Sequence, residues 1–331
     1  MTALIVDRLV PASAAPDDLA AWGAIFSAGQ SEASGGTVDA AALAESLRAE
    51  VDPQARYLAA RRSVTGPIVG VAALHPQPQD ARVGFLRLFV TPAERRAGVG
   101  AALLDRAFRD AAAAGFEKIQ STVIAGSPGE TFARNHSGLH VLLRLERQEQ
   151  RFDATVLRRC RDLAKRPHPG YRLAPWRGAA PEPLAASFGR VMGHVLDAPG
   201  AMFQMAAREW DAAEVRAWEE GMTSGGRHLL VCAAVDKASG AAVAATAASV
   251  PASGGPIADQ HDTAVLPDHR GRGLAAWIKA AHALSLHESF PEVSAVAVTV
   301  NQQNRQMIAV NQALGYKLVS ERLLVEMPVP R

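Results

Sequence analysis

The fold of this chain is decided by a stretch that occurs twice, once in each half. The first copy is Val90-Thr91-Pro92-Ala93-Glu94-Arg95-Arg96-Ala97-Gly98-Val99-Gly100, and the second is Val265-Leu266-Pro267-Asp268-His269-Arg270-Gly271-Arg272-Gly273-Leu274-Ala275. Both read Val-x-Pro and then Arg-x-x-Gly-x-Gly/Ala, followed by an Ala- and Leu-rich helical run. The offset is about 175 residues in a chain of 331, so the repeat has the size of a domain.

Each copy is expected to join a strand to the N-terminus of a helix through a glycine-rich turn. Glycine lets the backbone turn tightly, and the free N–H groups of the first helical turn donate to anions. Arg95, Arg96, Arg270 and Arg272 would add charge-assisted contacts to phosphate groups. The repeat therefore predicts sites for a phosphorylated cofactor.

The overall composition excludes several classes of function. The chain has 35 basic and 33 acidic residues, so the net charge of +2 does not indicate a nucleic-acid surface. The basic cluster at 158–166 is interpreted as part of a solvated linker. Cys160 and Cys232 lie in no metal or redox spacing, which favours a reducing, cytoplasmic location and predicts no metal site. We also expect no membrane span, because the apolar run 229–250 is broken by charged residues and reads as two strands.

Each half follows the pattern β-α-α-β-β-β-α-β-α-β. Residues 1–152 form the first predicted domain, 153–170 a charged linker with some helical character, and 171–331 the second domain. A doubly wound sheet does not explain this order, which predicts α/β domains with a mixed sheet and helices on both faces.

At the two Arg-x-x-Gly-x-Gly/Ala loops the chain resembles the GNAT superfamily of acyl-CoA-dependent N-acyltransferases. The likeness covers both halves, so the chain looks like an actinomycete-type tandem GNAT protein. The resemblance implies a mixed, largely antiparallel central sheet in each domain, acetyl-CoA or another acyl-CoA as cosubstrate, and a small-molecule amine as acceptor. It assigns CoA binding to Val90, Arg95, Arg96, Gly98, Val99, Gly100, Ala264, Val265, Arg270, Gly271, Arg272, Gly273, Leu274, Ala275 and Asn304.

The second half carries the family's second signature more fully, from Thr299 through Asn304 and Asn311 to Leu314-Gly315-Tyr316. Asn304 would open a helix near pantetheine, although an Asn there is also an ordinary helix N-cap. Ser127 stands at the matching place in the first half, whose following segment is less regular. We therefore predict catalysis in the second half.

The family's base position lies eleven residues before the first loop arginine, at Asp259 here and at Gly84 in the first half. Strand alternation would place Asp259, His261 and Thr263 on one face, with Gln260 and Asp262 on the other. Asp259 or His261 would act as base, unless both serve the structure alone. A backbone N–H near Ala264 or Val265 would meet the oxyanion.

The family's usual Tyr general acid is missing from both halves. Asn311 and Arg134 occupy its positions, so Asn311 is left to hydrogen-bond the thiolate or CoA. We interpret Tyr316 as a packing residue at the start of a strand.

The acceptor pocket would be built by the first two helices of the second domain and their connection. The residues concerned are Met192, His194, Leu196, Asp197, Met202, Phe203, Met205, Trp210 and Trp218. Met and aromatic residues at helical spacing also fit a plain core. If some line a pocket, the acceptor has an apolar portion and is not a polycationic aminoglycoside.

Two other functions compete with this interpretation. Gly271-x-Gly273-x-x-Ala276 matches a dinucleotide fingerprint formally, but five residues separate the strand from its first glycine. A non-catalytic acyl-CoA-binding or regulatory protein stays open because the Tyr is missing. The oligomeric state is predicted to be a monomer or a homodimer.

Overall fold

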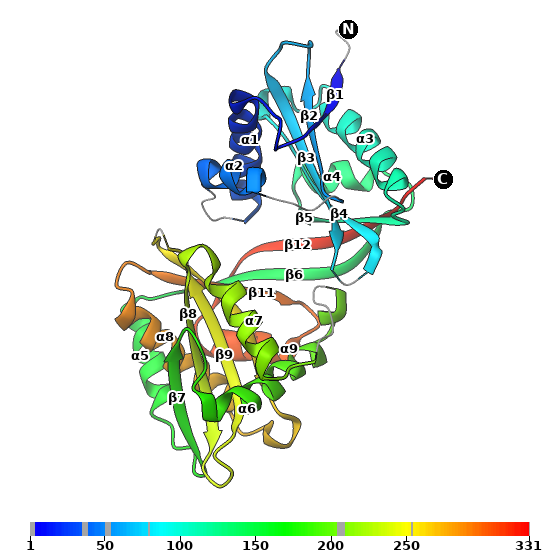
Figure 1. The fold of residues 1–331 in the computed structure, drawn as a ribbon. Coiled ribbons are helices and arrows are strands. Elements are labelled where there is room, and N and C mark those ends of the chain that lie inside the picture. The colour runs from blue at the N-terminus through cyan, green and yellow to red at the C-terminus, as the bar shows by residue number, and fades with distance from the viewer. Residues whose placement is uncertain are drawn as a thin grey trace. The chain divides into compact units, whose positions relative to one another are not determined.

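The computed structural model describes residues 4–34, 39–49, 54–78, 80–203, 209–252 and 254–330. It is a mixed α/β structure, which confirms the predicted fold class, and the chain divides into two compact units (Figure 1). Unit 1 consists of residues 1–143 and 322–331, and unit 2 of residues 144–321.

In the first half the elements follow the predicted order. They are β1 (Ile5–Leu9), α1 (Pro16–Ser34), α2 (Ala40–Ala49), β2 (Arg56–Arg61), β3 (Ile68–Gln77), β4 (Asp80–Val90), η1 (Pro92–Glu94), α3 (Val99–Ala113), β5 (Lys118–Ile124), α4 (Pro128–Arg134) and β6 (His140–Arg151).

The second half repeats this order after one additional helix. The elements are α5 (Ala154–Ala164), β7 (Tyr171–Arg177), α6 (Glu182–Gly193), η2 (His194–Asp197), η3 (Ala201–Phe203), α7 (Ala212–Thr223), η4 (Ser224–Gly226), β8 (His228–Asp236), β9 (Ala242–Val250), β10 (Ile257–Val265), η5 (Pro267–His269), α8 (Leu274–Ser289), β11 (Ala295–Asn301), α9 (Arg305–Ala313) and β12 (Lys317–Pro328).

Several helices begin where the sequence offers a side-chain cap. The carboxylates of Asp153 and Asp211 accept the backbone N–H groups of Val156 and Glu214, and Asp39 accepts that of Ala41. Such caps satisfy N–H groups that the first turn of a helix leaves open.

The sheet of unit 1 has the strand order β1-β2-β3-β4-β5-β12. β4 pairs with β5 in parallel, and the other neighbours pair antiparallel. Helices α1 and α2 cover one face through a core around Trp22 and Phe26, and α3 covers the other around Leu103 and Leu104. Unit 1 is therefore a mixed sheet with a hydrophobic core on each face.

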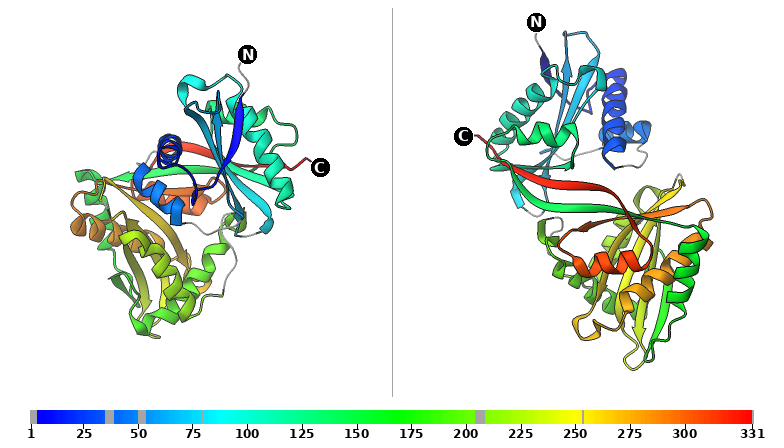
Figure 2. Two further views of the ribbon diagram at one scale, coloured as in Figure 1. Left: turned by 45° about the horizontal axis from the view of Figure 1, so that its top comes forward. Right: turned by 180° about the vertical axis from the view of Figure 1, so that it is seen from behind.

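The sheet of unit 2 has the matching order β7-β8-β9-β10-β11-β6, with β10 and β11 parallel. Helices α6 and α7 pack on one face around Phe188 and Val215. Helices α5, α8 and α9 lie on the opposite face, as the view from behind in Figure 2 shows.

The two units exchange their last strands. β6 belongs to the first half of the sequence, yet its residues from Leu145 onward pair with β11 in unit 2. β12 ends the second half, yet its residues from Arg322 onward pair with β5 in unit 1. The predicted domains, 1–152 and 171–331, follow the sequence repeat. The compact units are divided at 143/144 and 321/322 instead, so they do not test the bounds of the repeat, which stay a prediction.

Helix α5 is a structural part of unit 2 rather than a solvated linker. Its buried face consists of Val156, Leu157, Cys160 and Leu163, while its arginines are exposed. Val156, Cys160 and Leu163 join the core under α8 and β11. The alternation of apolar and basic residues in this segment is that of an amphipathic helix. Among the described residues, no helix is long and apolar enough to cross a membrane.

Candidate active site

The two repeated loops have the backbone that the sequence predicts. Each strand is followed by a short 3₁₀ turn, η1 or η5, and each helix begins at a glycine in the left-handed region, Gly98 with φ +82° and Gly273 with φ +75°. Among the residues that the structure describes, no side chain caps α3 or α8. The first-turn N–H groups of both helices are therefore free of side-chain acceptors, as an anion site requires.

The first arginine of each loop is already engaged. The Nε of Arg95 donates to the carbonyl of Val90 at 3.2 Å, and its Nη2 pairs with Glu32 at 2.8 Å. Arg270 repeats this arrangement with the carbonyl of Val265 at 2.9 Å and with Asp197 at 2.5 Å. Both arginines therefore fix the loop to its own strand and to an acid.

Asp197 receives a second hydrogen bond, from the Nδ1 of His194 at 2.9 Å. The hydrogen bonds from Arg270 and then His194 hold the pKa of Asp197 below its usual value. Arg272 is exposed, and its Nη2 lies 3.4 Å from the carbonyl of Asp268. Of the two second-loop arginines, Arg272 is the one without an acidic partner among the described residues.

The loops differ at one strained position. Arg96 has φ +66°, whereas the matching Gly271 has φ +75°. Glycine adopts this conformation without steric cost, but an L-residue with a Cβ does not. The first loop thus keeps the same backbone path at a cost that the second avoids.

Of the remaining residues predicted to bind CoA, some are buried in the core and others are partly exposed. Val99 and Leu274 are buried and anchor the helices to the sheet, whereas Gly100 and Ala275 are partly exposed. Val90 and Val265 are partly buried at the strand ends, and Ala264 is buried in the core under α6 and α7. These placements leave their roles toward CoA as predictions.

Both units separate their parallel strands shortly before the loop. The pairing of β4 with β5 ends at Phe85 and Gln120, and the pairing of β10 with β11 ends at Asp259 and Ala297. Beyond these pairs the two strands of each unit are no longer paired with each other. Backbone groups there are no longer used by the parallel ladder and can serve a ligand.

β10 carries a bulge at this point. Gln260 pairs with Ala248 and Thr263 with Thr246, so three residue steps on β10 match two on β9. In unit 1, β4 keeps a continuous register with β3 from Gly84 to Val90. The bulge is therefore a feature of unit 2 at this position.

The bulge corrects two sequence-based expectations. Thr263 shares a face with Gln260 rather than with Asp259, because the side chains of Thr263 and Gln260 both hydrogen-bond to Thr246.

The bulge also shifts the alignment of the two halves by one residue. Asp259 is the last residue of β10 that pairs with β11, and the equivalent residue of β4 is Phe85, not Gly84. A Cβ at Gly84 would lie 2.7 Å from Leu74, so that position has no room for an acid.

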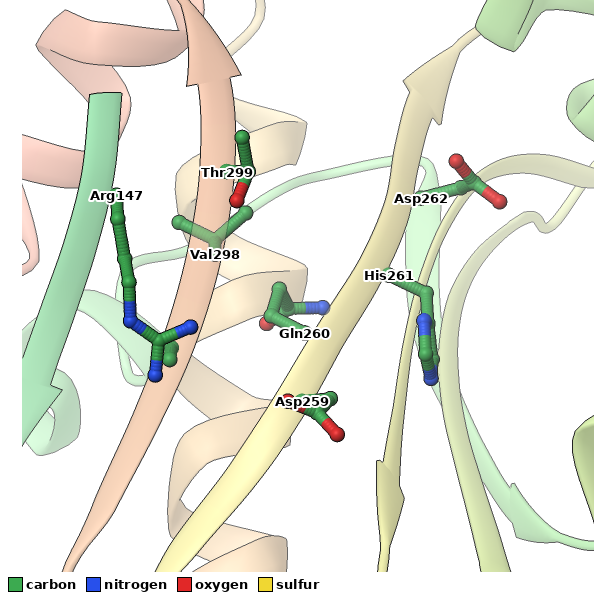
Figure 3. Close-up of a pocket in the computed structure, with 8 residues that line it drawn as sticks. Arg147, Asp259, Gln260, His261, Asp262, Val298 and Thr299 are labelled. Carbon is green, nitrogen blue, oxygen red and sulfur yellow. The ribbon is translucent and has the colours of Figure 1, made fainter. Parts of the chain in front are cut away.

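The opening in unit 2 leads into a cavity of about 230 Å³. In Figure 3, β10 and β11 diverge beside it, with Asp259 and Gln260 at the level where they part. The lining residues are Arg147, Asp259, Gln260, His261, Asp262, Ala297, Val298 and Thr299. The structure thus brings the two predicted base candidates, Asp259 and His261, into one cavity.

Asp259 and His261 are linked through a polar network on the face of α6 and α7. Arg227 pairs with Asp259 at 2.8 Å and also donates to the Oγ of Ser249 at 2.6 Å. The Nε2 of His261 lies 2.7 Å from the same Oγ. Burial lowers the pKa of His261, so its ring is neutral at pH 7 and has a nitrogen able to accept a proton.

Asn304 is the N-cap of α9, where its side chain accepts the N–H of Met307 at 3.1 Å. Ser127 caps α4 in the same way, because its side chain accepts the backbone N–H of Glu130. Asn311 is fully buried and donates to Gln148 at 2.9 Å, away from the cavity lining. Tyr316 is buried in the core, as predicted for a packing residue.

The predicted acceptor region is only partly available to a ligand. Met192 and Trp218 are buried in the core of unit 2, whereas Met202 and Phe203 are exposed. Met205 lies outside the described residues. His194 and Asp197 are engaged with each other and, through Asp197, with Arg270.

Sequence reasoning missed Arg147, Arg227 and Ser249. Arg147 is in the first half of the sequence but lines the cavity of unit 2. The alternating charges from Arg144 to Arg151 show a strand with ionisable side chains on a sheet face. That signal identifies unusual residues but does not indicate which unit they serve.

Comparisons with known proteins agree with this architecture. Residues 26–129 match the family model described as "Acetyltransferase (GNAT) family". A tandem GNAT protein from the clavulanic acid biosynthesis pathway, solved without AcCoA, has a TM-score of 0.79 at 22% identity over 99% of both chains.

Two further solved structures align along the whole chain. A GCN5-related N-acetyltransferase from Sphaerobacter thermophilus gives a TM-score of 0.66 at 14% identity, covering 99% of this chain and 96% of that one. A probable N-acyltransferase from Enterococcus faecalis gives 0.56 at 10% identity, covering 99% and 73%. No curated protein sequence matches the chain.

Proposed function

We propose that this chain, which has the fold of a tandem GNAT protein, transfers acetyl from acetyl-CoA to a primary amine of a small molecule. Residues 26–129 belong to the acetyltransferase family, and the fold extends over the whole chain. Proteins of this family are acyl-CoA-dependent N-acetyltransferases in general. The acetyl donor, the amine acceptor and the residues named below are parts of the proposal.

The observation that carries the proposal is the bulged opening between β10 and β11. It presents a carboxylate, Asp259, and a neutral imidazole, His261, to one cavity. An N-acyltransferase needs a group that removes a proton from the ammonium and a place for a small amine. Unit 2 supplies both at the point where its parallel strands part.

The loops fit a nucleotide pyrophosphate. Gly98 and Gly273 hold left-handed conformations, and within the described parts of the chain no side chain caps the N-termini of α3 and α8. Around Gly273, a would-be Cβ has only the Nε2 of His168 within 4 Å, so the phosphates would meet an open cradle. Arg272 would add charge there, while Arg270 keeps the loop in place through Asp197.

Bound acetyl-CoA would supply a thioester whose carbonyl carbon accepts the amine. His261, or Asp259 through a water, takes one proton from the ammonium, and the amine nitrogen then forms the new C–N bond. Backbone N–H groups freed by the bulge would stabilise the negative charge on the carbonyl oxygen. The C–S bond breaks as the nitrogen loses its second proton, and a water passes that proton to the departing CoA thiolate, so the products are the amide, CoA thiol and the protonated base.

The two units would then have unequal roles. Unit 2 is proposed to catalyse, and unit 1 to hold CoA or to support the fold, because Phe85 stands at the register position of Asp259. We place the protein in the cytoplasm as part of the same proposal. Both thiols are free and buried, and burial raises the pKa of Cys160 to about 11 and of Cys232 to about 12.

One observation favours the alternative of a non-catalytic acyl-CoA-binding protein. At the two positions of the family's general acid stand Asn311, which is fully buried, and Arg134, which pairs with Glu130 at 2.6 Å. Neither side chain donates a proton to a thiolate at neutral pH.

The experiment is a thiol-release assay with acetyl-CoA and a panel of amines. We expect saturable, amine-dependent release of free CoA and an acetylated amine in the mass spectrum. Binding of acetyl-CoA in calorimetry without release by any amine would overturn the enzyme and support the alternative.

A further inference from the structure

We propose that Arg147 binds a carboxylate carried by one of the two reactants in the cavity of unit 2. The inference rests on the proposed acyl transfer and names the chemical class of a substrate. The carboxylate belongs either to the acceptor, as in an amino acid, or to the acyl group, as in a dicarboxylic acyl-CoA.

Arg147 is a buried cation that lacks sufficient partners. The residue is only 8% exposed, and its Nε is buried with no hydrogen-bond partner among the described residues. Its nearest acid is Glu149, 3.6 Å from Nη2, which is beyond hydrogen-bond distance. Glu149 also faces Arg151 at 3.5 Å, so one carboxylate is shared by two guanidinium groups.

Such an arrangement is costly unless a ligand completes it. A buried charge needs both an opposite charge and hydrogen bonds to balance the loss of water. The guanidinium group has five N–H donors in a planar fork that matches the two oxygens of a carboxylate. Arg147 therefore has the open donors and the charge that recognise a carboxylate.

Arg147 lies on the same sheet face as the candidate bases. It is paired in register with Thr299 on β11, and Glu149 is paired with Ala297, which in turn pairs with Asp259 on β10. Directly paired residues point to the same side of a sheet. In Figure 3 the Arg147 side chain extends along β11 toward the level of Asp259.

The cavity consequently has two chemically different sides. The β6 side offers a guanidinium group, and the β10 side offers the Asp259 carboxylate and the His261 imidazole. A reactant with a carboxylate would be held at the first side while the amine and the thioester react near the second. Arg147 is thus a binding residue, and the bonds that form and break are those of the proposed transfer.

The test uses matched reactant pairs that differ in one carboxylate. Glycine, alanine, leucine and phenylalanine are each compared with their amides, using acetyl-CoA, and succinyl-CoA is compared with acetyl-CoA, using the amides. The variants are Arg147→Gln, which removes the charge, and Arg147→Lys, which keeps it without the fork. The control is Arg151→Gln, on the same strand beside the same Glu149 but 79% exposed.

We expect the wild type to prefer the carboxylate member of one pair type by about 10- to 100-fold in kcat/KM, as for a hydrogen-bonded charge. Arg147→Gln should lose this preference, Arg147→Lys should keep part of it, and Arg151→Gln should keep it fully. A preference among acceptors assigns the carboxylate to the amine, and a preference for succinyl-CoA assigns it to the acyl group. No preference in either pair, or one that survives in Arg147→Gln, overturns the proposal.

A binding measurement separates this inference from the proposed function. Calorimetry of N-acetylalanine against its amide, and of succinyl-CoA against acetyl-CoA, needs no turnover. If no amine releases thiol, acyl transfer fails, yet a carboxylate-dependent affinity lost in Arg147→Gln still supports the inference. Turnover with equal affinities within both pairs would overturn the inference alone. A thermal melt of each variant verifies that it is folded.

Discussion

Unit 1 and unit 2 part their parallel strands at matching pairs, Phe85 with Gln120 and Asp259 with Ala297, but the strands continue differently. β4 continues to pair with β3 in an unbroken register, whereas β10 has a bulge, in which one extra residue of β10 lies opposite β9. That residue changes which side chains face α6 and α7. A single inserted position thus distinguishes β10 from β4 where both strands leave their parallel partners.

The helices that follow β4 and β10 show a second difference. Six and nine residues after its N-cap glycine, α3 has Leu104 and Ala107, whereas α8 has Lys279 and His282. All four side chains are buried. Burial lowers the pKa of Lys279 to about 7 and that of His282 to about 4. Unit 2 therefore keeps costly polar groups where unit 1 has a plain hydrophobic core.

The largest effect is expected from a matched pair of loop variants. Gly273→Glu places a carboxylate at the phosphate cradle of α8 and should reduce acetyl-CoA turnover by at least about 100-fold. Gly98→Glu makes the same change on α3, at a similar φ, and should leave most of the turnover. Thiol release and CoA calorimetry measure both variants. If Gly98→Glu is the inactive one, the active site lies in unit 1.

Asp259→Asn tests the acid that β10 has where β4 has Phe85. If the carboxylate assists proton removal, turnover should fall by about 100-fold, at the lower end of general-base effects, with CoA affinity unchanged. Steady-state kinetics and CoA calorimetry give the two quantities. Asp162→Asn, on the exposed face of α5, is the matched control. A variant with wild-type kcat would remove Asp259 as base and leave His261.

Lys279→Leu gives α8 the side chain that α3 has at Leu104. Because the folded pKa of Lys279 is about 7, below the ordinary lysine value of 10.5, the unfolded chain binds more protons between these pH values. Stability of unit 2 should therefore rise with pH from about 7 to about 10.5.

The variant should lose that slope and gain up to several kcal/mol at pH 7 and below, since one pKa unit is worth about 1.4 kcal/mol. Hydrogen exchange of α8 peptides, with α3 peptides as internal reference, measures the change. An unaltered slope in Lys279→Leu would assign the pH dependence to other groups.

The smallest effect concerns the strained loop residue. Arg96→Gly should stabilise unit 1 by less than about 1 kcal/mol, because relief of the left-handed strain is partly offset by the greater freedom of glycine in the unfolded chain. The converse change, Gly271→Arg, should destabilise unit 2. Urea denaturation reports both, and a stabilised Gly271→Arg variant would contradict the strain argument.

Much of the site was readable from short-range patterns. The glycine turns at Gly98 and Gly273 and the cap at Asn304 all depend on residues within a few positions of one another. The shared face of Asp259 and His261 followed from strand alternation and is confirmed by their common neighbour Ser249. The face of Thr263 did not follow, because a bulge depends on how β9 pairs with β10.

The sequence by itself determined the repeat, the order of elements in each half and the backbone of both loops, because these arise from local propensities and glycine conformations. Only the tertiary structure decided the strand exchange and, with it, the arrival of Arg147 from the first half in the cavity of the second. Strand pairing joins residues far apart in the chain, so its partners and register are set by the packing of whole faces and not by any local pattern.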